Sequence, residues 1–502
     1  MTGHDLYLLS PELSMAGLAT ILVVLDLFLG RKDLLAWVAV LGLLLPLGFA
    51  ISLWVGLDRD GTGQMAGLFD TLSVDKFSLF FKFLFIGTTA AVVLTSTDYV
   101  KRLGRLQGEY YALILFSATG MMLLASTTEL ITIYIALELT ALPVAALAAF
   151  MRDSRSSESG MKFLILSAIS SAVLLYGMVW VYGYTGTTNL EEIARRIGDV
   201  GLRGDQPFGG YALLLGVVLM IAGFGFKIAS VPFQMWAPDV YEGAPTPVTA
   251  FLSVASKAAG FAILLRIFYV AFPWEAMSLE WSAIFAILAV ASMTLGNLVA
   301  IPQRNIKRML AYSTIAHAGY LLVGLAAATS RASEGNLLGG PTGILFYLGG
   351  YAVTNMAAFG AVIAISNKTG SDRIEDFAGM ARRAPLLAAV LTLALVSLTG
   401  VPPTVGFMVK LNIFGAAVDS GLTWLAIAGA LNSVISAYYY VRVVKVMYLS
   451  PPAAEERVPS PLPMTVAVTV AMAGVAFFGV YPAPLLDFAR TAAATLRIAL
   501  IF

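Results

Sequence analysis

Long apolar stretches separated by short polar segments dominate this chain of 502 residues. A helix needs about 20 mainly apolar residues to cross the hydrocarbon core of a bilayer. Fourteen stretches reach that length, so the pattern predicts an all-α, polytopic membrane protein with about 14 transmembrane helices. The expected spans are 9–30, 33–56, 77–95, 110–127, 129–150, 161–184, 211–236, 246–270, 280–300, 308–328, 342–366, 384–416, 422–448 and 463–481.

Two of these stretches contain residues that interrupt helices. The twelfth, 384–416, is too long for one straight span, and Gly400-Val401-Pro402-Pro403 divides it. Proline removes a backbone donor and kinks or breaks a helix. Gly223 and Gly225, followed by Pro232, are expected to weaken the seventh span in the same way. Broken helices at corresponding positions of two halves are typical of transporters built from inverted repeats.

The distance between the two interrupted spans predicts two inverted five-helix repeats within a single membrane domain, 1–502. The expected divisions are an N-terminal group of three helices (1–100), a first antiporter-like repeat with spans 4–8 (110–270), a second with spans 9–13 (280–448) and a C-terminal helix (463–502). The odd-numbered connections carry 18 Lys and Arg residues, against 9 in the even-numbered connections and the tails. Because cytoplasmic loops are enriched in these residues, we expect both termini to lie outside the cytoplasm.

The composition narrows the classes of function. Hydrophobic residues make up 59% of the chain and charged residues 12%. The absence of cysteine excludes disulfides, thiolate zinc sites and cysteine-ligated iron–sulfur clusters. With two histidines and no Gly-rich phosphate loop, we expect no cofactor and no metal in this chain. A net charge of +1 gives no bulk attraction for nucleic acid, and the expected surroundings are the lipid bilayer.

Ionisable side chains within the apolar stretches are the candidates for function. Lys227, Lys257 and Lys410 each lie deep in a predicted span. A charge at membrane depth costs at least about 3 kcal/mol, and a buried lysine can exchange a proton near neutral pH, so the three lysines suggest a proton path. Glu138 lies in the middle of the fifth span, and Lys227 is its natural partner. The alternatives are a buried salt bridge that only fixes helix packing, and a Lys410 that extends to the membrane interface.

His317 is a candidate relay between Lys257 and Lys410. It lies in the sequence MLAYSTIAHAGYLL beside Ser313, Thr314 and Tyr320, which are able to form a polar chain with water. The alternative is a packing role for a single histidine in an apolar helix. Two further charged residues, Lys82 and Asp26, lie near the ends of their spans and are expected at the membrane interface.

Several motifs resemble those of one family of membrane subunits. The stretch VPFQMWAPDVYEGAPTPVTAFLSVASKAAGFAILLRIF is similar to the most distinctive segment of the subunit N family of NADH–quinone oxidoreductase, the antiporter-like subunits of bacterial respiratory complex I. PELSMAGLATILVVLDLF, LELTALPVAALAAF, RNIKRMLAYSTIAHAGYLL and GVPPTVGF resemble it too, in order and over nearly the whole chain. Two departures are Gln234, where the family usually has histidine, and Val409-Lys410-Leu411, where it more often has Gly-Lys-Phe.

The resemblance implies a proton-translocating subunit of complex I in the bacterial plasma membrane. Its proton-path positions would fall on Glu138, Lys227, Lys257 and Lys410. NADH, FMN, iron–sulfur clusters and quinone would belong to partner subunits, and the partners would include sister antiporter-like subunits. The alternatives are a subunit of a multisubunit cation/proton antiporter, a non-pumping membrane scaffold of an oxidoreductase, and a quinone-binding catalytic subunit.

The predicted orientation can be tested with a reporter fused after Phe502. A reporter active only outside the cytoplasm should be active in this fusion, because fourteen crossings return the chain to the side on which it began. A reporter active only in the cytoplasm would mean that the predicted number of crossings is wrong by one.

Overall fold

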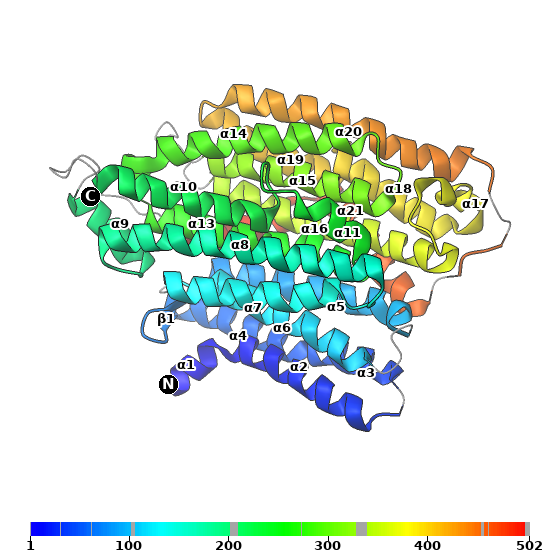
Figure 1. The fold of residues 1–502 in the computed structure, drawn as a ribbon, viewed down its shortest axis with the longest axis horizontal. Helices are drawn as coiled ribbons and strands as arrows, with labels where there is room; N and C mark the ends of the chain where they lie inside the picture. The colour runs from blue at the N-terminus through cyan, green and yellow to red at the C-terminus, as the bar shows by residue number, and fades with distance from the viewer. Residues whose placement is uncertain are drawn as a thin grey trace.

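The computed structural model describes residues 2–30, 32–61, 63–101, 106–200, 209–272, 274–327, 339–452, 456–459 and 461–496. Within these ranges the chain forms a bundle of long, roughly parallel helices (Figure 1). Thirteen described helices are long and apolar enough to span a membrane. The prediction of an all-α, multi-pass membrane protein is confirmed. Phe502, the site proposed for the reporter, lies outside the described residues.

The elements follow the predicted divisions of the chain. The N-terminal group contains α1 (Gly3–Leu8), α2 (Ser10–Phe28), α3 (Asp33–Gly42), α4 (Leu44–Asp60), the antiparallel strands β1 (Gln64–Gly67) and β2 (Leu72–Asp75), and α5 (Lys76–Val100). Next come α6 (Gln107–Ser126), α7 (Leu130–Ala148), α8 (Ser154–Thr185), α9 (Leu190–Val200), α10 (Gly209–Ile228), α11 (Trp236–Gly243), α12 (Thr246–Phe251), the π-helix η2 (Leu252–Ser256), α13 (Lys257–Arg266) and the π-helix η3 (Ile267–Ala271). The remainder comprises α14 (Trp274–Ala300), α15 (Ile306–Ala326), α16 (Gly339–Thr369), the 3-10 helix η5 (Ile374–Phe377), α17 (Met380–Arg383), α18 (Pro385–Thr399), α19 (Val405–Asp419), α20 (Thr423–Leu449), α21 (Leu462–Val480) and α22 (Ala483–Ala493).

The twelfth predicted span is the one that does not form a single helix. It consists of α18 and α19, fifteen residues each, joined at the Gly400–Thr404 segment. Together with the thirteen long helices, this broken helix accounts for the fourteen predicted spans.

Both broken helices end their first halves in the same way. At the end of α10, Ala229 has a φ of 56° and the N–H of Ser230 donates to the carbonyl of Gly225 at 2.9 Å. At the end of α18, Gly400 has a φ of 91° and the N–H of Val401 donates to the carbonyl of Val396 at 3.3 Å. A left-handed residue followed by a bond that spans six residues is the Schellman motif, which terminates helices. The matching ends support an equivalence between the two halves of the chain.

The position of the first break differs from the one expected from glycines. Gly223 and Gly225 lie inside the regular helix α10, and the chain leaves the helix only after Ile228. The two glycines serve packing instead: a Cβ on Gly223 would lie 2.6 Å from the Cβ of Leu174, and one on Gly225 would lie 2.5 Å from the ring of Phe233. The break itself follows from the left-handed Ala229 and from the segment that contains Pro232.

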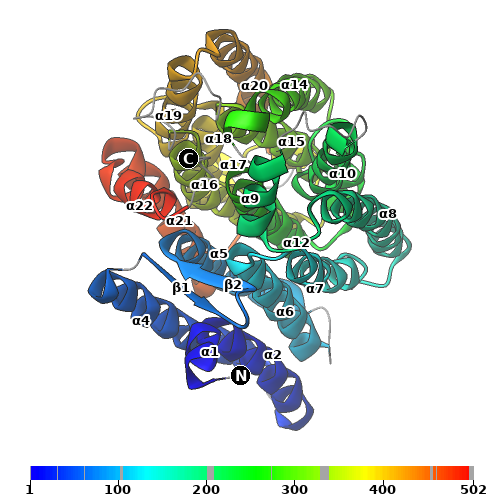
Figure 2. The same cartoon turned by 90° about the vertical axis from the view of Figure 1, so that its left-hand side faces the viewer.

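The most buried helices occupy the centre of the bundle. The segment from α12 to η3 is buried throughout, and α15 and α16 are buried over most of their length. Viewed along the bundle, α16 lies centrally, whereas α2 and α4 lie at one edge and α8 and α20 at others (Figure 2). A helix that is apolar on all sides must be surrounded by other helices, so any polar group on α13, α15 or α16 is removed from lipid.

The two ends of the described chain lie at the same end of the bundle. Asp5 accepts a hydrogen bond from the N–H of Leu68, in the β1–β2 hairpin, at 3.0 Å. The hairpin leads directly into α5, where the N–H of Phe77 donates to Thr495 at 3.0 Å. An even number of membrane crossings has this consequence, and fourteen is even. Which side of the membrane this end faces stays a prediction.

Two buried ion pairs attach α5 to its neighbours. Lys82 is fully buried and lies 2.7 Å from Glu12 of α2, so the expectation that Lys82 lies at the interface is wrong. Arg266 of α13 donates to both carboxylate oxygens of Asp75 at 3.1 and 3.0 Å, and all four side chains are at most 4% exposed. Asp26 is buried as well and pairs with a lysine near the end of α2. Neither Glu12 nor Asp75 stood out in the sequence, because each lies at the polar end of a span.

Replacement of Lys82 by methionine is expected to destabilise the protein by about 3–5 kcal/mol, because Glu12 would remain buried without a counter-ion. The double variant Glu12→Met/Lys82→Met should lose less, since it leaves no unpaired charge. Unfolding of the detergent-solubilised protein, followed by circular dichroism, measures both. A matched control is Lys101→Ala, which removes an exposed pair with Asp98 and should change stability by about 1 kcal/mol at most. Equal stability of Lys82→Met and the control would contradict a structural role for the pair.

Candidate functional site

Lys227 lies in the last turn of α10, just before the first break. Its side chain is 7% exposed, and its ammonium donates to the hydroxyl of Thr140 on α7 at 2.5 Å. The aliphatic part of the side chain packs on α13, where a Cβ added to Gly260 would lie 3.3 Å from the Cγ of Lys227. Gly260 is one helical turn from Lys257, so α13 connects the surroundings of the two lysines. The C-terminal end of a helix carries partial negative charge, which favours a cation at this position.

Glu138 does not form a direct ion pair with Lys227. The two groups interact electrostatically, but no carboxylate oxygen lies within 4.0 Å of the Lys227 ammonium among the described residues. One oxygen of Glu138, Oε1, is buried and has no hydrogen-bond partner in the described chain. Thr140, half a turn further along α7, takes the position at the ammonium that the sequence assigned to the carboxylate. The pairing predicted from sequence is therefore long-range.

Lys257 begins α13, directly after the π-helix η2. The side chain is 3% exposed, its ammonium donates to the backbone carbonyl of Thr314 on α15, and it lies 5.6 Å from the centre of the Tyr351 ring. Thr314 also bonds to the Tyr351 hydroxyl at 3.1 Å, so the same two residues surround the amine. Short π-helical segments inside α-helices occur frequently at functional sites.

His317 lies between the second and third lysines, as the sequence predicted. Both Lys257 and Lys410 interact electrostatically with its ring. Its Nδ1 lies 2.7 Å from the hydroxyl of Tyr347 and its Nε2 lies 3.4 Å from that of Tyr440. The ring therefore has a hydroxyl at each nitrogen, which is the arrangement that a proton relay needs. This arrangement goes beyond a packing role for the histidine.

Lys410 reaches back from α19 to the end of α18. Its ammonium donates to the carbonyls of Leu398 at 2.9 Å and Thr399 at 3.0 Å, and it lies 4.5 Å from the centre of the Tyr320 ring. The side chain is 5% exposed, so it does not extend to the membrane interface. The last carbonyls of a helix lack partners within the helix, and a cation satisfies them. Lys410 thus caps the broken helix and gains two backbone acceptors.

Tyrosine hydroxyls complete the connection between Lys257 and Lys410, and the sequence analysis missed most of them. Tyr440 bonds to Ser313 as well as to His317, and the Tyr320 ring lies 5.5 Å from the His317 ring. Tyr320 is held in turn by Asn297, whose amide donates to its hydroxyl at 3.2 Å. Ser313, Thr314 and Tyr320 were expected to form the polar chain. The additional members are Tyr347, Tyr351, Tyr440 and Asn297. Tyrosine is common in buried apolar helices, so only the fold reveals which hydroxyls meet.

The comparisons with known proteins cover nearly all of the chain. Residues 127–436 match the family model described as NADH:quinone oxidoreductase/Mrp antiporter, TM. The chain is 46% identical to NADH-quinone oxidoreductase subunit N of Dehalococcoides mccartyi, over 96% of this chain and 98% of the relative. It is 43% identical to the subunit of the same name in Moorella thermoacetica, over 98% and 99%. The chain belongs to the NADH-quinone oxidoreductase subunit N family.

A solved structure shares the fold. A chain of respiratory complex I from Thermus thermophilus, determined with bound aureothin, matches with a TM-score of 0.76 and 32% identity, over 95% of this chain and 98% of that one. The resemblance stated from the motifs is therefore confirmed, and so is the antiporter-like architecture. The matched family region, 127–436, begins before Glu138 and includes Lys227, Lys257, His317 and Lys410.

We expect replacement of Lys410 to impair proton pumping in a graded way. Methionine would leave the carbonyls of Leu398 and Thr399 without their donor, whereas arginine keeps a cation but cannot release its proton at usable pH. Both variants should be defective and Lys410→Met the more so, as measured by proton uptake into membrane vesicles during quinone reduction. Near-normal pumping in both variants would remove Lys410 from the path.

Proposed function

We propose that this chain is a proton-translocating membrane subunit of an NADH–quinone oxidoreductase of the complex I type. Glu138, Lys227, Lys257, His317 and Lys410 would form its proton path. The observation that carries the proposal is the continuous row of buried cations and hydroxyls that joins the two broken helices through α13 and α15. The full-length relatives carry the name of the oxidoreductase subunit, which supports this assignment over a subunit of a cation/proton antiporter.

The geometry supports stepwise transfer along the row. An ionised Glu138 stabilises the Lys227 ammonium at a distance, so neutralisation or displacement of the carboxylate weakens that support. Lys227 would then release its proton toward Lys257, whose helix it contacts at Gly260. Thr314, Tyr351 and the His317 ring would carry the proton from Lys257 toward Lys410, at the second break.

The energy for this transfer would come from electron transfer in other subunits. Moving one charge across the membrane against 100 mV requires about 2.3 kcal/mol. NADH, FMN, the iron–sulfur clusters and quinone would be bound by partner subunits, and this chain would contribute no redox centre. Its neighbours in the membrane would include sister antiporter-like subunits. We place it in the bacterial plasma membrane, with both termini outside the cytoplasm.

The central test of the proposal is Lys227→Ala in the intact complex. This variant removes the titratable amine at the first break, and alanine is well tolerated in a helix. We expect assembly to persist while proton pumping and the coupled quinone reduction fall sharply. Pumping is measured as acidification of inverted membrane vesicles with NADH as electron donor, and assembly by copurification of the iron–sulfur subunits.

A matched control is Lys368→Ala, which removes a lysine that is 39% exposed and paired with Glu456 at the end of α16. It should pump like the wild type. Normal pumping by Lys227→Ala in a fully assembled complex would contradict the proposal and would favour the non-pumping scaffold.

A further inference from the structure

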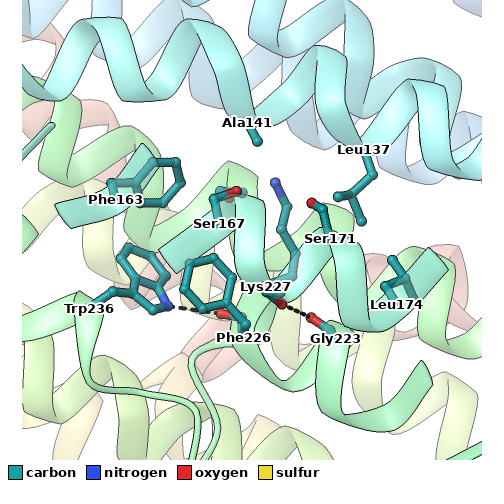
Figure 3. Close-up of a pocket in the computed structure, with 12 residues that line it drawn as sticks. Leu137, Ala141, Phe163, Ser167, Ser171, Leu174, Gly223, Phe226, Lys227 and Trp236 are labelled. Atoms are coloured by element: carbon teal, nitrogen blue, oxygen red, sulfur yellow. Dashed lines mark hydrogen bonds between the residues drawn. The ribbon is translucent and has the colours of Figure 1, made fainter. Parts of the chain in front are cut away.

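A small enclosed cavity lies beside the Lys227 ammonium, between α7, α8 and α10. Its volume is about 10 Å³, close to the roughly 10–15 Å³ that one water molecule requires. Leu137 and Ala141 of α7, Ser167 and Ser171 of α8, and Lys227 are among the residues that line it. In Figure 3 the hydroxyls of Ser167 and Ser171 point toward the same space as the ammonium.

The polar groups around the cavity are sufficient to hold a water molecule. An ammonium group has three donors, and among the described residues Lys227 uses one of them, to Thr140. The other two donors are available to the cavity. A buried water typically makes about three hydrogen bonds, and the ammonium with two serine hydroxyls supplies that number.

The buried face of α8 continues from this cavity toward α11. Residues 156, 159, 163, 167 and 171 are buried at the spacing of one helix face, and four of these five are serines. The exception is Phe163. Beyond it, the hydroxyl of Ser159 donates to the backbone carbonyl of Asp239 at 3.2 Å, and the Asp239 side chain is 36% exposed. Polar groups therefore extend from a solvent-accessible carboxylate to the lysine, with one interruption.

Three aromatic side chains fill that interruption. The Phe163 ring lies 5.0 Å from the Trp236 ring and 6.2 Å from the Phe226 ring, measured between centres, and the last two are 5.4 Å apart. Trp236 is fixed by its indole N–H, which donates to the Phe226 carbonyl at 2.9 Å (Figure 3). All three line the cavity. We call Phe163, Phe226 and Trp236 the aromatic barrier.

We propose that one water molecule, held by Lys227, Ser167 and Ser171, occupies this cavity and delivers protons to Lys227 from the α11 end of the molecule, with the aromatic barrier separating it from that end. The inference rests on the proposed function in one respect, which is that Lys227 exchanges protons. Charged groups near Lys227 come from two of the helices packed on it, Glu138 on α7 and Lys257 on α13. The cavity side, on α8, contributes serines.

The first test is a cryo-EM map of the intact complex at a resolution that shows other buried waters. Density for a water within hydrogen-bond distance of Lys227 Nζ, Ser167 Oγ and Ser171 Oγ is expected. An empty cavity in such a map would overturn the proposal, whatever the role of Lys227.

The second test compares Ser167→Ala/Ser171→Ala with the control Ser96→Ala, a buried serine on α5 outside the row. Without the serines, proton delivery becomes limiting, so turnover should fall several-fold, and the loss should grow as the pH rises and protons become scarce. A loss of equal size at every pH would indicate a packing role and overturn the proposal.

Phe163→Leu, a smaller change in the aromatic barrier, should increase passive proton leakage through vesicles in the absence of NADH. Unchanged leakage would exclude the barrier from the route. These outcomes are separate from that of Lys227→Ala. If that variant pumps normally, the proposed function fails even where the water is seen. If it does not pump and the cavity is dry, only the present inference fails.

Discussion

The interaction on which the rest of the site depends is the bond between a buried ammonium and a neutral oxygen. Lys227 donates to a threonine hydroxyl, Lys257 to a backbone carbonyl and Lys410 to two backbone carbonyls. The cations outside the row behave differently, since Lys82 and Arg266 each face a carboxylate in direct contact. A carboxylate partner holds the cation in its charged form, because loss of the proton would leave a buried anion alone. A neutral oxygen supports the charge without requiring it.

The broken helices supply these neutral oxygens at membrane depth. A continuous helix has its carbonyls occupied, so a lysine in its middle finds no acceptor in the backbone. Ending α18 at Thr399 frees the last carbonyls for Lys410, and the close approach of the two halves is possible because Gly406 has no side chain, since a Cβ there would lie 1.7 Å from the carbonyl of Ser397. The first break places Lys227 in the corresponding last turn of α10. The break is therefore what makes a titratable residue tolerable at this depth.

Sequence reasoning found the residues that are unusual for their surroundings and missed those that are ordinary. Lysine in an apolar stretch is rare, so Lys227, Lys257 and Lys410 are evident from the order of residues alone. Tyr347 and Tyr440 are not, because tyrosine in a buried helix needs no explanation until its hydroxyl is found against His317. The first break was expected at Gly223 and Gly225, but glycine in a helix has two meanings, a weak point or a close contact, and only the neighbouring Leu174 and Phe233 decide between them. Glu12 and Asp75 escaped notice for a third reason: each begins a helix, where an acidic residue is common.

The π-helical segments on either side of α13 have a consequence for how Lys257 is aimed. A π-helical turn contains one residue more than the α-helical turn it replaces, and one residue corresponds to about 100° of rotation around the helix axis. η2 ends immediately before Lys257 and η3 begins immediately after Arg266. Transfer of the extra residue from one segment to the other would turn everything between them about its own axis while both ends of the span stayed in place. α13 is thus built like a spindle between two bearings, with Lys257 at one end and the arginine that grips Asp75 at the other.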